Sequence, residues 1–327
     1  MEESNETINY WRGLDLNIAI LPDVKSWATG AMARGLVSTL PKDWTIDTRF
    51  TTKSAGSKML PLRNSEIEYD VIYTYFWRWG RKFFDDFKTW FPNTKLMAGV
   101  ASYSGVDTKL WKLLTSCGLY HGMNTWSKEM YEHCKGDHPR FEYTRHGIDH
   151  KIFTPAPDGR RVDPFIVGWC GNVTHSKKNA KVLRKLKFNV LVHGRHLDQI
   201  VGENVSRYTN VLLPYEEVGK FYHQVSALAI PSISETGPLM ALEAASSGLP
   251  IVSTRCGIVP ELIDEEWLVD ETRDHDVIAR EINKRLHILQ GDHTLAYKVG
   301  MENRARILES WTHEACANDW VRFFEST

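Results

Sequence analysis

Short apolar runs rich in β-branched residues alternate with helix-length stretches along this chain of 327 residues. In the first half, the helix-length stretches 30–40 and 127–134 separate several of these runs. The runs themselves stand at residues 17–22, 44–50, 69–75, 95–101, 118–124 and 141–145. Alternation of this kind predicts an α/β fold in which helices cover both faces of a parallel sheet.

The same rhythm restarts in the second half of the chain. Its apolar runs stand at residues 165–170, 188–194, 210–214, 226–232, 250–254 and 267–270. Between the halves, residues 154–164 are rich in Pro, Gly and charge, as linkers are. A chain of this length also has enough residues for two cores. We therefore expect two doubly wound, Rossmann-like domains with a cleft between them, covering residues 1–158 and 159–327.

Composition and charge argue against several classes of protein. The N-terminus is acidic and polar, and nowhere do about 18 apolar residues run together, so neither a signal peptide nor a membrane span is expected. The five cysteines form no Cys-x-x-Cys pair, which favours reduced thiols in a cytoplasm. The 13 histidines show no metal-binding spacing, so no structural metal is expected. The net charge of -1 provides no general attraction to nucleic acid.

Two carboxylates, Glu235 and Glu243, stand on either side of a predicted helix start. Pro238 suits a first helical position, and Gly248 suits the end of the helix. The N–H groups at this start are suited to a diphosphate, with Glu243 beside a ribose and Glu235 beside a sugar. An isolated pair at this spacing is more typical of exposed acids. Here, however, apolar runs flank the pair, which places it at the carboxyl end of a parallel strand, where such sheets bind ligands.

This Glu-x(7)-Glu arrangement resembles the signature of the retaining glycosyltransferases of family four, which have the GT-B fold. Residues 145–157 are similar to that family's interdomain segment, and residues 167–179 to its first donor-domain strand and phosphate loop. Residues 210–232 are similar to the strand, helix and strand before its acidic motif. The resemblance implies an acceptor-binding first domain and a donor-binding second domain. It also implies a last helix, about 310–325, that packs back on the first domain.

The resemblance further implies a reaction, which is transfer of a sugar with retention from a nucleotide-sugar to an acceptor hydroxyl. The donor is expected to be UDP-linked, for example UDP-glucose, and to act as a co-substrate, so no cofactor is expected. Metal-independent transfer is also expected, because a lysine and a helix dipole would balance the charge of the diphosphate.

The expected site residues follow from matching the family's motifs to this chain. Glu235, Lys178 and Asn172 are the expected catalytic residues, and Asn172 stands where the family has an Arg. Either Lys177 or Lys178 would balance the diphosphate, and Arg195 would compensate for the missing Arg. The residues expected to bind the donor are Glu243, Lys177, Arg195, Gly237, Pro238, Leu239, Met240, Pro214, Tyr215 and Gly30.

On the acceptor side, this chain has Ser102 and Tyr103 where many family members carry a His. Residues 76–84 interleave aromatics with three cations. Trp77 and Arg78 in this patch are therefore candidates for stacking on a sugar or a base, or for docking on anionic lipid. The alternative is that the aromatics pack on the sheet while Arg and Lys extend to solvent.

The sequence leaves the acceptor open. A glycan or glycolipid of the cell envelope is the family's usual target, which would suit a cytoplasmic protein that is free or peripheral to the inner membrane. A hydroxylated base in bacteriophage DNA, presented by base flipping, is an alternative. The missing Arg and His leave a third reading, in which the chain is an inactive GT-B module that binds a nucleotide-sugar or a glycan. No obligate protein partner is indicated.

Overall fold

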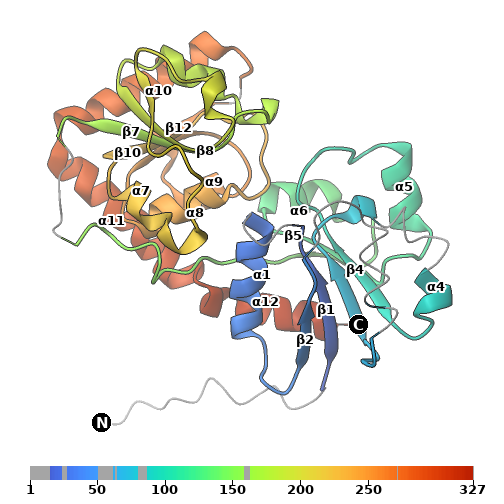
Figure 1. The fold of residues 1–327 in the computed structure, drawn as a ribbon. Helices are drawn as coiled ribbons and strands as arrows, with labels where there is room; N and C mark the ends of the chain where they lie inside the picture. The colour runs from blue at the N-terminus through green and yellow to red at the C-terminus, as the bar shows by residue number, and fades with distance from the viewer. Residues whose placement is uncertain are drawn as a thin grey trace, which may run out of the picture.

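The computed structural model shows two α/β domains, each built on one parallel sheet of six strands (Figure 1). It describes residues 15–23, 28–50, 62, 65–79, 87–157, 163–270 and 272–326. The strand order is β2-β1-β3-β4-β5-β6 in the first domain and β12-β11-β10-β7-β8-β9 in the second. The predicted fold class, an α/β protein with two doubly wound sheets, is therefore confirmed.

In the first domain the central strands β1, β3, β4 and β5 are buried, whereas the edge strand β2 is partly exposed. The strands are β1 Asn17–Leu21, β2 Thr45–Thr48, β3 Val71–Thr74, β4 Lys95–Gly99, β5 Gly122–Thr125 and β6 Phe141–Tyr143. Its helices are α1 Ala28–Thr39, the 3₁₀ helix η1 Trp77–Trp79, α4 Phe87–Trp90, α5 Lys109–Ser116 and α6 Lys128–Cys134. Thr108 and Ser127 cap α5 and α6 by accepting a backbone N–H of the first turn.

The second domain carries the C-terminal helices. Its strands are β7 Ile166–Asn172, β8 Asn189–Arg195, β9 Val205–Arg207, β10 Ala227–Ile230, β11 Ile251–Thr254 and β12 Leu268–Val269. The 3₁₀ helices are η2 Ser176–Lys178, η3 Ala180–Lys185, η4 Leu197–Gln199, η5 Tyr215–Glu217 and η6 Glu265–Trp267. The α-helices are α7 Gly219–Tyr222, α8 Leu239–Ser246, α9 Val259–Leu262, α10 His275–Gly291, α11 His293–Ser310 and α12 His313–Glu325.

One predicted strand is wrong. Residues 210–214 form no strand, and the edge of the second sheet is β9 instead. Val211 is 67% exposed, and its backbone N–H is bound by the hydroxyl of Thr209 rather than by a neighbouring strand. The apolar residues Leu212 and Leu213 that follow line a cavity between the domains, which explains why this exposed segment has the composition of a strand.

Each sheet contains a point at which successive strands are added on opposite sides. In the first sheet this point lies between β1 and β3, and in the second between β7 and β10. Open parallel sheets bind ligands outside the carboxyl ends of the strands at such points. Asp23 and Phe76 follow β1 and β3, while Asn172 ends β7 and Glu235 follows β10. All four residues line the same cavity, so the two binding edges face each other.

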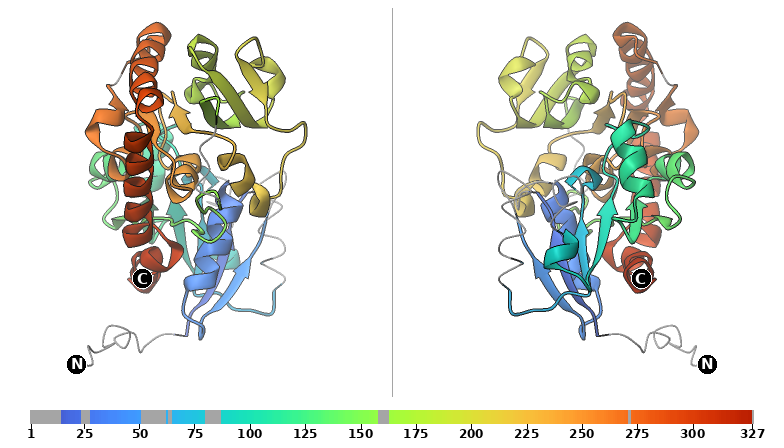
Figure 2. Two further views of the ribbon diagram at one scale, coloured as in Figure 1. Left: turned by 90° about the vertical axis from the view of Figure 1, so that its left-hand side faces the viewer. Right: turned by 90° about the vertical axis from the view of Figure 1, so that its right-hand side faces the viewer.

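The last helix, α12, packs on the first domain, although the chain has by then passed through the second (Figure 2). Trp320, Phe323 and Phe324 are buried around Tyr73 of β3, with ring centroids 5.4, 6.1 and 5.7 Å from the Tyr73 ring. Thr312 caps the helix by accepting the backbone N–H of Ala315. This cap separates α12 from α11 and lets the chain turn onto the first sheet.

Polar contacts hold α12 and the cleft in place. The guanidinium of Arg145 donates to Asp319 of α12 at 2.8 Å, and the carbonyl of Arg145 accepts from Trp320 Nε1 at 2.7 Å. On another side, Glu261 of α9 accepts from the hydroxyl of Tyr143 at 2.7 Å and from the backbone N–H of Lys128 at 3.1 Å. Both sets of contacts join segments that lie more than 100 residues apart in the chain.

The variant Phe323→Ala should lower the free energy of unfolding by about 3–5 kcal/mol, because it removes a fully buried ring from a packed core. Leu308→Ala on α11, at a residue 45% exposed, is the control and should change it by less than about 0.5 kcal/mol. Urea unfolding followed by tryptophan fluorescence measures both effects. Equal stability of the two variants would show that α12 does not support the core of the first domain.

Candidate active site in the interdomain cleft

A cavity of about 400 Å³ lies between the carboxyl edges of the two sheets. This volume is within the usual range for small-molecule sites. The first domain contributes Asp23, Thr29, Met32, Phe76, Ala101 and Trp126 to its wall. Of the residues predicted to act on or bind the donor, those that line the cavity are Asn172, Lys177, Lys178, Arg195, Tyr215, Glu235, Gly237, Pro238, Leu239, Met240 and Glu243.

Glu235 lies in a cluster of charges where β7 and β10 end. Its side chain is buried, and the Nζ atom of Lys178 lies 2.8 Å from its Oε1. The Nζ atom of Lys177 lies 3.9 Å from Oε2. Both lysines belong to η2, which is attached to the β10 loop because Ile233 donates its backbone N–H to the carbonyl of Lys177 at 2.8 Å. Two cations and one acid are therefore brought together from separate segments.

Glu243 lies on α8 with its carboxyl group buried at the wall of the same cavity. The hydroxyl of Tyr222 donates to its Oε2 at 2.5 Å. Burial raises the pKa of Glu243 to about 7, although the Tyr222 hydroxyl and the charge of Lys178 lower it in part. Near neutral pH this group therefore exists in both forms, and each form has oxygen lone pairs that can accept hydrogen bonds.

The N-terminus of α8 lies between the two acids. The helix begins at Leu239 with Pro238 at the N-cap, one residue later than predicted. A Cβ atom at Gly237 would lie 2.3 Å from Cδ1 of Trp126 and 2.8 Å from Nε2 of His146, so only glycine fits between this turn and the first domain. Burial lowers the pKa of His146 to about 4, so its ring is neutral in this contact.

Asn172 ends β7 and shapes the loop that carries the lysines. Its Oδ1 accepts from the backbone N–H and the hydroxyl of Thr174, at 3.1 and 2.8 Å. Arg195 ends β8 directly opposite Asn172 in the strand register and also lines the cavity. The two strands come close here because Gly194, with φ of 138°, has no side chain: a Cβ would lie 1.8 Å from the carbonyl oxygen of Gly171.

Several predicted residues do not line this cavity. Gly30 is buried within α1, although the neighbouring Thr29 reaches the cavity. Pro214 is exposed at the N-cap of η5. The hydroxyl of Ser102 accepts the backbone N–H of Ser104 in the loop after β4. Tyr103 lines a separate cavity, which borders Glu235 on its other side.

The aromatic and basic patch at residues 76–84 differs from the predicted acceptor surface. Trp77 is only 3% exposed, and its ring packs edge-on against Trp111 with 4.9 Å between centroids. The prediction of Trp77 on the acceptor side is therefore wrong, because this ring fills the core of the first domain. Arg78 is exposed, with its guanidinium carbon 5.6 Å from the Trp77 ring. The other two cations of the patch lie outside the described residues.

The first domain lines the cavity with residues that were not among the predicted site residues. Asp23, Phe76, Ala101 and Trp126 each stand one or two residues after a strand, so the carboxyl-end rule for parallel sheets could have indicated them. His175 also lines the cavity without having been predicted, and its pKa is lowered by burial and by the charges of the two neighbouring lysines. Asp23 accepts a hydrogen bond from the hydroxyl of Thr29, which positions its carboxylate at the cavity.

Within the described residues, no group of three or more His, Cys, Asp or Glu side chains is arranged to hold a metal ion. The chain's Asp-x-Asp sequence at 274–276 lies outside the cavity, where Asp274 caps α10. No helix in the described parts of the chain combines the length and the apolar character needed to cross a membrane. All five cysteines are free.

Comparison with protein families identifies the second domain. Residues 165–287 match the family described as "Glycosyl transferases group 1". The match lies within the second domain and covers less than half of the chain. The resemblance predicted from the acidic motif is thereby confirmed.

Two relatives match only part of the chain. The D-inositol 3-phosphate glycosyltransferase of Paenarthrobacter aurescens (strain TC1) is 25% identical over 166 residues, which is 42% of this chain and 40% of that protein. The sulfoquinovosyl transferase SQD2 of Arabidopsis thaliana is 43% identical over 51 residues, which is 16% of this chain and 10% of that protein. The matched parts therefore span 40% or less of these relatives.

Solved structures match both domains together. Sucrose-phosphate synthase from Thermosynechococcus elongatus has a TM-score of 0.74 at 15% identity, covering 95% of this chain and 98% of that one. HepE of Anabaena, solved in complex with UDP-glucose, has a TM-score of 0.74 at 11% identity, covering 95% and 100%. The predicted GT-B fold is confirmed by this likeness, which at such low identity concerns the fold alone.

The buried Glu243 should make stability depend on pH. Its pKa is about 7 in the folded chain and near 4.5 in the unfolded one, so the folded chain binds more protons between these values. The free energy of unfolding should therefore fall as pH rises through this window. In Glu243→Gln this contribution is absent. The free energy of unfolding of the variant, relative to that of the parent, should therefore rise by about 3 kcal/mol between pH 4 and pH 8, at 1.36 kcal/mol per pKa unit.

Urea midpoints at several pH values measure this difference. The variant Glu266→Gln, at an exposed carboxylate of η6, is the control and should follow the parent at every pH. A constant difference in stability between Glu243→Gln and the parent across this range would contradict the assigned titration.

Proposed function

We propose that this chain is a retaining glycosyltransferase that moves a sugar from a UDP-linked donor to a hydroxyl of an acceptor. The observation that carries the proposal is the position of Glu235 and Glu243 on either side of the N-terminus of α8, inside the cleft, with Lys178 held on Glu235. The group 1 glycosyl transferase match supports the reaction class. The likeness to HepE, whose structure holds UDP-glucose, supports the choice of donor.

In this proposal the diphosphate of the donor lies at the start of α8. The first N–H groups of a helix have no partner within it, and the helix dipole favours an anion there. Leu239 and Met240 supply such groups at the cavity wall. Lys177 and Lys178 add two positive charges beside them. Glu243 accepts hydrogen bonds from the ribose hydroxyls.

The chemical step needs stabilisation of the leaving diphosphate. The bond between the anomeric carbon and the phosphate oxygen breaks, and the acceptor oxygen bonds to the same face of that carbon. The proton of the acceptor hydroxyl passes to the leaving phosphate oxygen. Negative charge grows on the diphosphate during this step, and the ammonium groups of Lys177 and Lys178 stabilise it. Glu235 accepts hydrogen bonds from the donor sugar and orients Lys178 through their 2.8 Å contact.

We assign the acceptor to the part of the cavity formed by the first domain. The half-buried Phe76 offers aromatic surface there, and Asp23 offers a carboxylate that can accept hydroxyl hydrogens. A carboxylate at this position opposes the approach of a phosphate backbone. This favours a glycan or glycolipid hydroxyl over a base in DNA as the acceptor.

Replacement of Lys178 by Gln should reduce the release of UDP from UDP-glucose by about 10²–10³-fold, because one charge that stabilises the leaving group is lost. Lys181→Gln, at an exposed lysine of η3, is the matched control and should leave the rate unchanged. A coupled assay for UDP in the absence of acceptor measures the rate. Equal rates in the two variants would show that Lys178 does not act in the chemical step. If the parent binds UDP-glucose but releases no UDP, the result would favour an inactive module that only binds the donor.

Release of UDP from UDP-glucose should persist in the presence of EDTA, because lysines and a helix N-terminus balance the charge of the diphosphate. The same UDP assay, run after removal of divalent ions, measures this. Loss of activity in EDTA with recovery on addition of Mg²⁺ or Mn²⁺ would contradict metal-independent transfer.

A further inference from the structure

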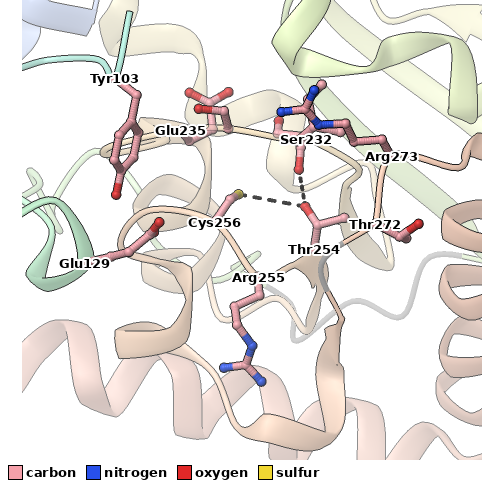
Figure 3. Close-up of a pocket in the computed structure, with 11 residues that line it drawn as sticks. Tyr103, Glu129, Ser232, Glu235, Thr254, Arg255, Cys256, Thr272 and Arg273 are labelled. Atoms are coloured by element: carbon pink, nitrogen blue, oxygen red, sulfur yellow. Dashed lines mark hydrogen bonds between the residues drawn. The ribbon is translucent and has the colours of Figure 1, made fainter. Parts of the chain in front are cut away.

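A second cavity, of about 470 Å³, lies on the other side of Glu235 from the donor cleft. Its wall is formed by the loops that follow β10, β11 and β12 in the second domain (Figure 3). Tyr103 and Glu129 of the first domain close it on the opposite side. Glu235 lines both cavities, so the two sites share one wall.

Two hydrogen-bond donors in this second cavity have no partner among the described residues. Ser232 is completely buried, and its hydroxyl makes no hydrogen bond there, although its carbonyl accepts one from the hydroxyl of Thr254. A buried hydroxyl without a partner is costly, so such a group indicates a ligand or a water. Arg273 is exposed and forms no hydrogen bond or ion pair within the described residues, and its side chain extends toward Ser232 in Figure 3.

The other charged groups of this cavity are already engaged or stand apart from these donors. Arg255 points away and pairs with Glu265. Glu235 is held by Lys178 at 2.8 Å and by Lys177 at 3.9 Å, so its negative charge is compensated. Glu129 lies on the first-domain side and is exposed. A guanidinium and a buried hydroxyl thus remain on one side of the cavity, which is the donor set that suits a carboxylate or a phosphate.

We propose that this second cavity binds an anionic group carried by a substrate, with Arg273 and Ser232 as the recognising residues. The proposal rests on the function proposed above, because Glu235 links this cavity to the donor sugar. The anion belongs either to the donor sugar, as the carboxylate of a uronate does, or to the acceptor, as the phosphate of a phosphorylated sugar does. In both cases Arg273 selects charged substrates over neutral ones.

Isothermal titration of the full chain tests this proposal with two matched pairs of ligands. The first pair is UDP-glucuronate and UDP-glucose, and the second is glucose 6-phosphate and glucose, added to protein saturated with UDP. The parent should bind the anionic member of one pair about tenfold more tightly, as expected for one charge-assisted contact. In Arg273→Gln this preference should disappear, while the affinity for UDP stays unchanged. Ser232→Ala should reduce the preference in the same direction.

Arg207→Gln, on β9 at the opposite edge of the sheet, is the control and should keep the preference of the parent. The pair that shows the preference identifies whether donor or acceptor carries the anion. No preference in either pair, or a preference that survives Arg273→Gln, would overturn the proposal. Failure of the parent to bind UDP would instead count against the proposed function, and binding of inorganic phosphate that is lost in Arg273→Gln would then still support the anion site.

Discussion

The packing of α12 on the first sheet is the interaction on which the cleft depends, because it fixes one binding edge relative to the other. A continuous series of contacts links the first sheet to α8. Helix α12 packs on Tyr73 of β3, α11 directly precedes α12, and α11 packs on the end of α8. At that end, Gly300 comes so close to α8 that a Cβ would lie 2.0 Å from the carbonyl oxygen of Gly248. Asn303 also donates to the carbonyl of Leu249 at 3.1 Å. The helix that carries Glu243 is therefore connected through α11 and α12 to the first domain.

The sheets could be predicted from the sequence because a strand buried on both faces leaves a continuous apolar run. The same signal failed at residues 210–214, where apolar residues face a cavity instead of a sheet. An apolar run in a sequence indicates side chains that are removed from water. It does not distinguish side chains in a protein core from those in the wall of a binding site. The error at Trp77 has the same cause in the opposite direction, since its ring was assigned to a surface while it packs on Trp111 in the core.

The acids and lysines of the site could be predicted because each lies within a short motif next to a strand. Their partners could not, because the contacts join distant segments. The hydrogen bond from Tyr222 to Glu243 depends on how α7 packs on α8, and the contact of Trp126 with Gly237 depends on how α8 packs on the first domain. The raised pKa of Glu243 likewise follows from burial, which no spacing reveals. The identity of the charged residues could thus be predicted from the sequence, whereas their hydrogen-bond partners and shifted pKa values could not.

The contact between Gly237 and the first domain limits how freely the two halves can be recombined. Trp126 and His146 fit against a turn without a side chain, so a second domain taken from a relative would be accepted only if it also carried glycine at this position. A chimera with any larger residue there would be pushed apart at the start of α8. This turn is therefore one of the places at which the two domains are matched, and exchanging one domain means exchanging both surfaces of the turn.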